Sequence, residues 1–79
     1  MEIAVYPLGT GGISVSREVS RVLDVLERSR LPYHTTVMGT VVEGMPDALF
    51  ALARELHSAV FGDTVNRVVT IIRVDECRK

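Results

Sequence analysis

Apolar residues recur along this 79-residue chain with two periods, one typical of strands and one typical of helices. Ile3 to Leu8 is short and rich in strand-forming residues, and it ends directly before the glycine cluster Gly9–Gly12. A final strand is also predicted from about Asn66 to Val74, where apolar side chains fall on both faces. These two segments predict the first and the last strand.

The segment after the glycine cluster has apolar residues at helical spacing. They are Val15, Val19, Val22, Leu23 and Leu26. We expect Ser14 or Ser16 to cap the start of this helix, because a serine oxygen can accept a first-turn amide that lacks a partner. The helix should end at Arg30-Leu31-Pro32, since proline disfavours a helical conformation at the residue before it.

A second helix is predicted to begin at Gly44-Met45-Pro46-Asp47, where proline suits the first turn and aspartate suits the helix dipole. Its buried stripe should comprise Leu49, Leu52, Ala53, Leu56 and Val60. Gly62 is expected to end it in a left-handed conformation.

Tyr33 to Gly44, between the two helices, combines four hydroxyl-bearing side chains, a histidine and a carboxylate with strand-forming residues. Two short strands fit if Met38-Gly39 makes a tight turn, with Gly39 supplying a positive φ. This register places His34 opposite Glu43 and Thr36 opposite Val41 on one face. The other face then carries Thr35, Val37, Thr40 and Val42.

The resulting order β-α-β-β-α-β predicts a single α+β domain over residues 1–79 with a ferredoxin-like fold. Both helices then cover one face of a four-stranded antiparallel sheet. The opposite face receives Val69 and Ile71 of the last strand and apolar residues of the first, so it is too apolar for a solvated monomer. We therefore expect a homodimer or homotetramer.

Composition narrows the function classes. The chain is 47% hydrophobic and 24% charged, which excludes a disordered segment. Its net charge of -1 offers no basic field for a phosphate backbone, so nucleic acid is not an expected partner. No apolar run approaches the length of a membrane span, and no signal-like segment begins the chain, which predicts a cytoplasmic protein without a membrane partner.

Several polar residues are candidates for chemistry, each with a plain structural alternative. Thr10, Ser14 and Ser16 lie in or just after a glycine-rich turn whose amides can converge on a polar ligand, or the segment is only a turn and a helix cap. His34 and Glu43 form either a general acid–base pair or an exposed cross-strand pair, and no nucleophile is tied to them by a motif.

The other histidine and the cysteine are not expected in a site. His57 lies one turn before Phe61, which indicates a partly buried packing residue. His34, His57 and Cys77 lack metal-ligand spacing, and Cys77 is expected to be a free, exposed thiol.

Three ordered blocks of the chain resemble the small thiamine-binding-protein family. They are Val5–Ser16 with its Pro-Leu-Gly-Thr-Gly-Gly, Tyr33–Gly44 with its Met-Gly-Thr and Glu-Gly, and Arg67–Asp75. The resemblance implies a ferredoxin-like fold, assembly into dimers and tetramers, and binding of thiamine or a related hydroxymethylpyrimidine without turnover. It therefore implies no catalytic residue, no cofactor and no metal.

A thiamine site needs a carboxylate, hydroxyl groups and apolar or sulfur-containing surface. Residues of these types in the resembling blocks are Glu43, Thr40, Thr36, Met38, Ser14 and Ser16, with Thr10 beside them. Two other classes stay open. One is a regulatory or assembly module without a small ligand; the other is a small ester hydrolase, for which Arg17 is the nearest candidate to hold an anion.

Overall fold

The computed structural model describes residues 1–8, 16–62 and 65–78, with the side chains of residues 16–18 excepted. Thr10 and Ser14 lie outside the described residues. Six elements follow one another along the chain: β1 (Glu2–Leu8), α1 (Ser16–Ser29), β2 (Tyr33–Thr36), β3 (Gly39–Val42), α2 (Pro46–Ala59) and β4 (Arg67–Arg73).

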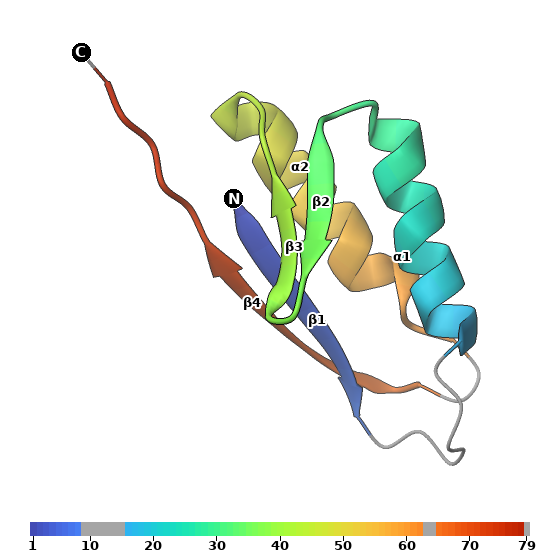
Figure 1. Ribbon diagram of the computed structural model, residues 1–79. Coiled ribbons are helices and arrows are strands. Elements are labelled where there is room, and N and C mark those ends of the chain that lie inside the picture. The colour runs from blue at the N-terminus through green and yellow to red at the C-terminus, as the bar shows by residue number, and fades with distance from the viewer. Residues whose placement is uncertain (9–15, 63–64, 79) are drawn as a thin grey trace.

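The four strands form one antiparallel sheet in the order β2-β3-β1-β4, and both helices lie on the same side of it (Figure 1). β1 is central and pairs with β4 along its whole length, from Glu2 opposite Arg73 to Leu8 opposite Arg67. The predicted α+β ferredoxin-like arrangement is confirmed. No helix in the described part of the chain is long and apolar enough to cross a membrane.

Helix α2 forms where its apolar period and its first-turn residues predict it. Pro46 occupies the first turn and Asp47 adds the expected acidic residue there. All five residues of the predicted stripe are buried. The predicted left-handed ending at Gly62 is wrong: the helix stops at Ala59, Val60 caps it in a right-handed conformation, and Gly62 instead pairs with Val65 through two 3.3 Å backbone hydrogen bonds.

The β2–β3 hairpin has a different register from the predicted one. Its loop is Val37-Met38, so Thr36 pairs with Gly39 and His34 pairs with Val41, not with Glu43. The Thr36 hydroxyl closes this loop by accepting the Met38 amide at 3.2 Å and donating to the Gly39 carbonyl at 3.0 Å. Gly39 has the predicted positive φ, but it takes it directly after the loop, as the first residue of β3.

Helix α1 ends where predicted, but by another device. Arg30, a non-glycine residue, adopts φ = 60° and turns the chain out of the helix. Ser29 supports this turn, because its hydroxyl donates to the Leu26 carbonyl at 2.6 Å and accepts the Leu31 amide at 3.2 Å.

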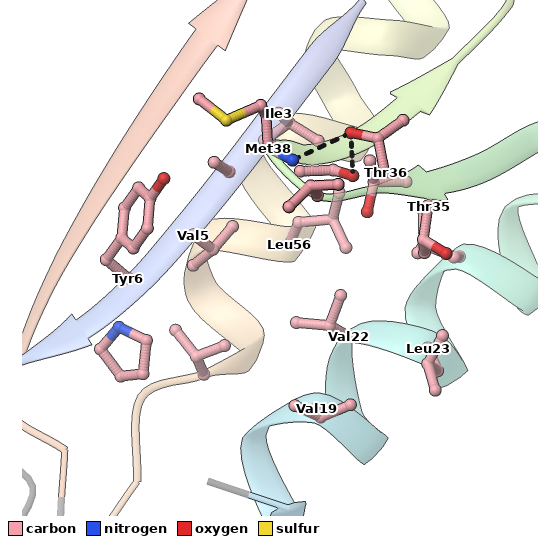
Figure 2. Close-up of a pocket in the computed structure, with 17 residues that line it drawn as sticks. Ile3, Val5, Tyr6, Val19, Val22, Leu23, Thr35, Thr36, Met38 and Leu56 are labelled. Atoms are coloured by element: carbon pink, nitrogen blue, oxygen red, sulfur yellow. Dashed lines mark hydrogen bonds between the residues drawn. The ribbon is translucent and has the colours of Figure 1, made fainter.

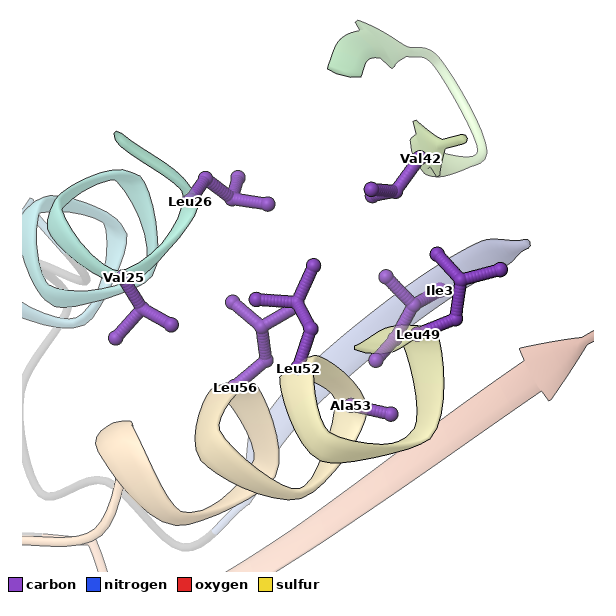
Figure 3. Packing of buried hydrophobic residues seen from close by; sticks show 8 residues of the cluster. All are labelled: Ile3, Val25, Leu26, Val42, Leu49, Leu52, Ala53 and Leu56. Atoms are coloured by element: carbon purple, nitrogen blue, oxygen red, sulfur yellow. The ribbon is translucent and has the colours of Figure 1, made fainter. Parts of the chain in front are cut away.

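The core is a cluster of eight buried apolar residues between α2, the C-terminal half of α1 and strands β1 and β3 (Figure 3). Its members are Ile3, Val25, Leu26, Val42, Leu49, Leu52, Ala53 and Leu56. The part of α1 before Val25 contributes none of them, and its Val19 and Leu23 remain 50% and 41% exposed. This part of the predicted apolar stripe therefore does not form core.

The sheet face away from the helices is apolar, as predicted. Ile3 faces the helices and is buried, so its neighbours along β1 point the other way. Tyr6 pairs with Val69 and Ala4 pairs with Ile71 across β1 and β4. Tyr6, Val69 and Ile71 are all exposed in the single chain. We call this surface the open sheet face.

Candidate functional site

A cleft of about 370 Å³ lies between α1 and the sheet (Figure 2). Most of its lining is on the side that the helices cover, and Ala4 and Tyr6, which face the other way, also border it. Its volume falls within the range of small-molecule sites, which begins at about 300 Å³. The cleft exists because the C-terminal half of α1 packs into the core while its N-terminal half leaves apolar side chains uncovered.

One wall of the cleft is the inner face of α1. Val19, Val22, Leu23 and Leu26 line it at the three- and four-residue spacing that brings side chains to one helix face. Leu26 is buried, Val22 is half-buried, and Val19 and Leu23 are exposed. The wall thus becomes more open from the core toward the start of the helix.

The floor is built from β1 and α2. Ile3 and Val5 point from the central strand toward the helices, and Leu56 and Val60 of α2 meet them. Figure 2 shows Val5 and Leu56 on one side of the hollow and Val22 and Leu23 across it. A flat aromatic ring entering here would meet aliphatic side chains on both sides.

The hairpin supplies hydroxyl groups at the edge of this apolar hollow. Thr35 and Thr40 pair across β2 and β3, and Thr40 also pairs with Ile3. Thr40 therefore shares the helix-facing side with buried Ile3, and Thr35 lies beside it. Thr36 also lines the cleft, but its hydroxyl is already bound to the Val37-Met38 loop.

Exposed apolar residues surround the mouth of the cleft. Val37 and Met38 in the hairpin loop are 102% and 67% exposed, and both belong to the lining. A β-branched residue and a methionine are unusual in a two-residue hairpin loop, where asparagine and glycine are favoured. The hairpin tip therefore offers apolar and sulfur-containing surface next to the hydroxyl groups.

Several described charged side chains of α1, the helix that lines the cleft, are paired with other groups. The Arg21 guanidinium donates to the Phe61 carbonyl at 3.0 Å, and Arg28 lies 3.3 Å from Asp24. The Tyr33 hydroxyl donates to the Glu27 carboxylate at 2.8 Å. This hydrogen bond, with smaller contributions from desolvation and the Glu27 charge, raises the pKa of Tyr33 above its ordinary value of 10.0.

Three of the seven predicted ligand residues line the cleft: Thr36, Met38 and Thr40. Glu43 does not, because it lies beyond the end of β3, where it is exposed and its amide donates to the Pro32 carbonyl at 3.0 Å. It is three strand-like steps from Thr40, or about 10 Å. Ser16 begins α1, but its side chain is outside the described part of the chain, as are Thr10 and Ser14.

The other polar candidates are not brought together. His34 and Glu43 are not cross-strand partners, so the hairpin does not place them as an acid–base pair. His57 is half-buried as predicted. Its ring packs edge-on against the ring of Phe61, with 5.5 Å between the two ring centroids, and its Nδ1 lies 2.7 Å from the Thr70 hydroxyl. Cys77 is free and exposed. Among the described residues no group of three potential ligands could hold a metal ion.

Most of the lining residues were not among the predicted ligand residues, and Val19, Leu23 and Thr35 show why. Val19 and Leu23 fell on the apolar stripe of the first helix and were assigned to packing, because spacing shows which residues share a face but not what covers them. Thr35 had been placed correctly on the same face as Thr40 and Val42, since the register error left the strand faces unchanged. The face that Thr35 shares with Thr40 was the signal that could have identified Thr35 as a cleft residue.

The fold and the apolar, hydroxyl-edged cleft between helix and sheet define a small ferredoxin-like protein with a candidate small-molecule cleft. Residues 1–79 match the family described as thiamine-binding protein, and the chain belongs to this family. It is 40% identical over 75 residues to the UPF0045 protein MJ1052 of Methanocaldococcus jannaschii, covering 95% of this chain and 73% of that protein. It is 36% identical over 81 residues to the UPF0045 protein YqgV of Bacillus subtilis, covering 98% and 78%.

Solved structures agree with the fold. The crystal structure of the hypothetical protein MJ1052 superposes with a TM-score of 0.83 at 39% identity, over 98% of this chain and 77% of that one. A domain of unknown function, DUF77, from Bacillus cereus gives a TM-score of 0.84 at 22% identity, over 96% and 72%. The second likeness concerns the fold alone.

Proposed function

We propose that this protein binds thiamine or a related hydroxymethylpyrimidine, without turning it over, in the cleft between α1 and the β2–β3 hairpin. The observation that carries the proposal is the cleft itself, an apolar hollow of about 370 Å³ with threonine hydroxyls on one side, in a member of the thiamine-binding protein family. We assign ligand contact to Thr35, Thr36, Met38 and Thr40.

The chemistry of the ligand matches these walls. An aminopyrimidine is a flat ring with hydrogen-bonding groups on its edge, so its faces suit the aliphatic side chains of Val5, Val22 and Leu56. Its edge suits the hydroxyls of Thr35 and Thr40, which can donate as well as accept. Met38 adds a polarisable sulfur at the mouth.

Ligand-induced thermal stabilisation tests this proposal. A ligand at about 100 times its Kd stabilises the native state by about 2.7 kcal/mol, which for a domain of this size corresponds to an increase in Tm of roughly 10 to 20 °C. Thiamine and hydroxymethylpyrimidine should produce such an increase and an unrelated pyrimidine should not. Equal responses to all three compounds would refute the proposal.

Substitutions then locate the site. Thr40→Val keeps the shape of the side chain but removes the hydroxyl, and it should weaken binding by about fivefold to tenfold, the effect of one hydrogen bond. Thr70→Val is the matched control, because Thr70 also faces the helices but lies outside the cleft. Glu43→Gln measures any contribution of Glu43 to ligand affinity. An unchanged affinity would mean that the cleft residues recognise the ligand without Glu43.

The open sheet face supports a second proposal, that copies of the chain associate through it into a homodimer or homotetramer. Tyr6, Val69 and Ile71 are adjacent and exposed there, and a patch of this kind is unfavourable in water. Light scattering at micromolar concentration should return a multiple of 8.7 kDa. Ile71→Lys should reduce it to the monomer, and a parent protein that is already monomeric would refute this proposal.

Assembly also provides the competing function, a regulatory or assembly module that needs no small ligand. The same measurements separate the two. A module of that kind loses its oligomeric state with Ile71→Lys and shows no thermal response to thiamine or hydroxymethylpyrimidine, whereas a binding protein responds to the ligand.

A further inference from the structure

The described walls of the cleft contain no formal charge. The described lining consists of aliphatic residues and Gly39, together with the hairpin threonines, Met38 and Tyr6, and it includes no aspartate, glutamate, lysine, arginine or histidine. A phosphate group inside these described walls would therefore lack an ionic partner among the lining residues.

Several described charges on α1 and β1 have other partners. On α1, Arg21 is bound to the Phe61 carbonyl, Asp24 to Arg28, and Glu27 to Tyr33. On the sheet, Glu2 lies 3.6 Å from Arg73. None of these described side chains belongs to the cleft lining.

An unpaired phosphate is far more costly to remove from water than a hydroxyl group, because a buried charge without a partner loses its hydration without compensation. An alcohol can instead hydrogen-bond to Thr35 or Thr40. We propose that the cleft selects the uncharged hydroxymethylpyrimidine alcohol and rejects its phosphate monoester. This inference rests on the proposed function and narrows it to the unphosphorylated class of ligand.

Calorimetry with the full chain tests the inference on a matched pair of ligands, hydroxymethylpyrimidine and its phosphate monoester. Mildly alkaline buffer keeps the aminopyrimidine ring uncharged, so the two ligands differ in charge only at the phosphate. The phosphate ester should bind at least about tenfold more weakly than the alcohol. Equal or tighter binding of the ester would overturn the inference and leave the proposed function standing. Binding of neither compound would overturn the inference, and if thiamine also failed to bind, the proposed function would fall with it.

A charge added to the wall tests the cause. Leu23 lines the α1 wall and is 41% exposed, so Leu23→Lys can keep its ammonium group near water while bringing a cation to the cleft. The ratio of ester affinity to alcohol affinity should rise at least about fivefold in this variant. The ratio is measured within one protein, so a general loss of affinity cancels.

Ser20→Lys is the control, because Ser20 is exposed on the same helix but does not line the cleft. It adds the same net charge and should leave the ratio nearly unchanged. An equal rise in both variants would show that overall charge governs the preference and would overturn the assignment to the cleft wall. No rise with Leu23→Lys, in a variant whose circular dichroism matches the parent, would overturn it as well.

Discussion

Gly39 is the position where the structure predicts the largest cost for the smallest change, a single added methyl group. Its φ is +151°, in a region that side-chain-bearing residues rarely adopt. A Cβ built there would lie 2.6 Å from the Ile3 carbonyl oxygen, on the backbone of the neighbouring strand. A comfortable carbon–oxygen contact is about 3.3 to 3.6 Å, so β1 and β3 would have to separate by roughly 0.7 to 1 Å.

The expected cost of Gly39→Ala combines two effects. Backbone strain in this region costs about 1 to 3 kcal/mol, and distortion of the β1–β3 pairing adds about 1 kcal/mol through weakened hydrogen bonds. We therefore expect a loss of about 2 to 4 kcal/mol of unfolding free energy. A chain of this size has a total of about 4 to 12 kcal/mol, so the variant should be close to unfolding at physiological temperature.

Urea unfolding followed by circular dichroism measures this loss, at one fixed protein concentration because association would make stability depend on concentration. Gly44→Ala is the matched control. Its added Cβ would meet the Leu31 Cδ2 at 3.2 Å, the movable end of a side chain, and Gly44 has no positive φ. The control should lose less than about 1 kcal/mol.

Two results would refute this reasoning. One is a Gly39→Ala variant within about 0.5 kcal/mol of the parent, which would mean that the strands yield without cost. The other is a Gly44→Ala loss as large as that of Gly39→Ala, which would mean that the damage comes from any methyl group and not from the φ and the carbonyl contact.

Three further predictions concern single contacts. Arg30→Gly should raise the unfolding free energy by about 0.5 to 1 kcal/mol in the same assay, because glycine adopts the φ of 60° at the end of α1 without strain, and a decrease would contradict this. Thr70→Val should lower the unfolding free energy by about 1 kcal/mol, because it removes the 2.7 Å hydrogen bond to His57. An unchanged unfolding free energy would contradict this prediction. In a Tyr6→Phe variant the tyrosinate absorbance reports Tyr33 alone and should titrate above pH 10.0, and Glu27→Gln should move the midpoint downward.

The pH dependence of stability follows from the direction of this last shift. The pKa of Tyr33 is raised in the folded state, so the stabilisation it contributes is fully present below the pKa of the unfolded chain. It is lost as the pH rises through the folded value. Denaturation above about pH 10 should therefore be shallower in Tyr33→Phe than in the parent, and identical curves would contradict the link.

The predictions that succeeded rest on periods that recur over many residues. The stripe of α2 needed no knowledge of neighbours, because five apolar residues on one face of an amphipathic helix have to be buried against something. The alternation in β1 and β4 likewise identified an apolar sheet face without specifying what lies against it. Element order then selected the ferredoxin-like arrangement.

The predictions that failed depended on single local contacts. The hairpin loop falls at Val37-Met38 because the Thr36 hydroxyl closes it and because Gly39 is needed in β3, where the Ile3 carbonyl leaves no room for a side chain. Gly62 was expected to end α2, yet pairing with Val65 takes its backbone groups. Neither contact can be predicted from the spacing of residues along the sequence.

By itself, the sequence determined which residues share a helix face or a strand face, the order of the six elements, and the polar character of the hairpin. Only the tertiary structure decided what each face meets. Val25 and Leu26 reach the core, whereas Val19 and Leu23, on the same helix, border an open cleft. Thr40 enters that cleft and Glu43 does not, because β3 ends between them and the chain turns toward α2. The physical reason is that a repeat in the sequence specifies only the direction in which side chains point from one helix or strand. A binding site depends on the distances between several helices and strands, which their packing sets.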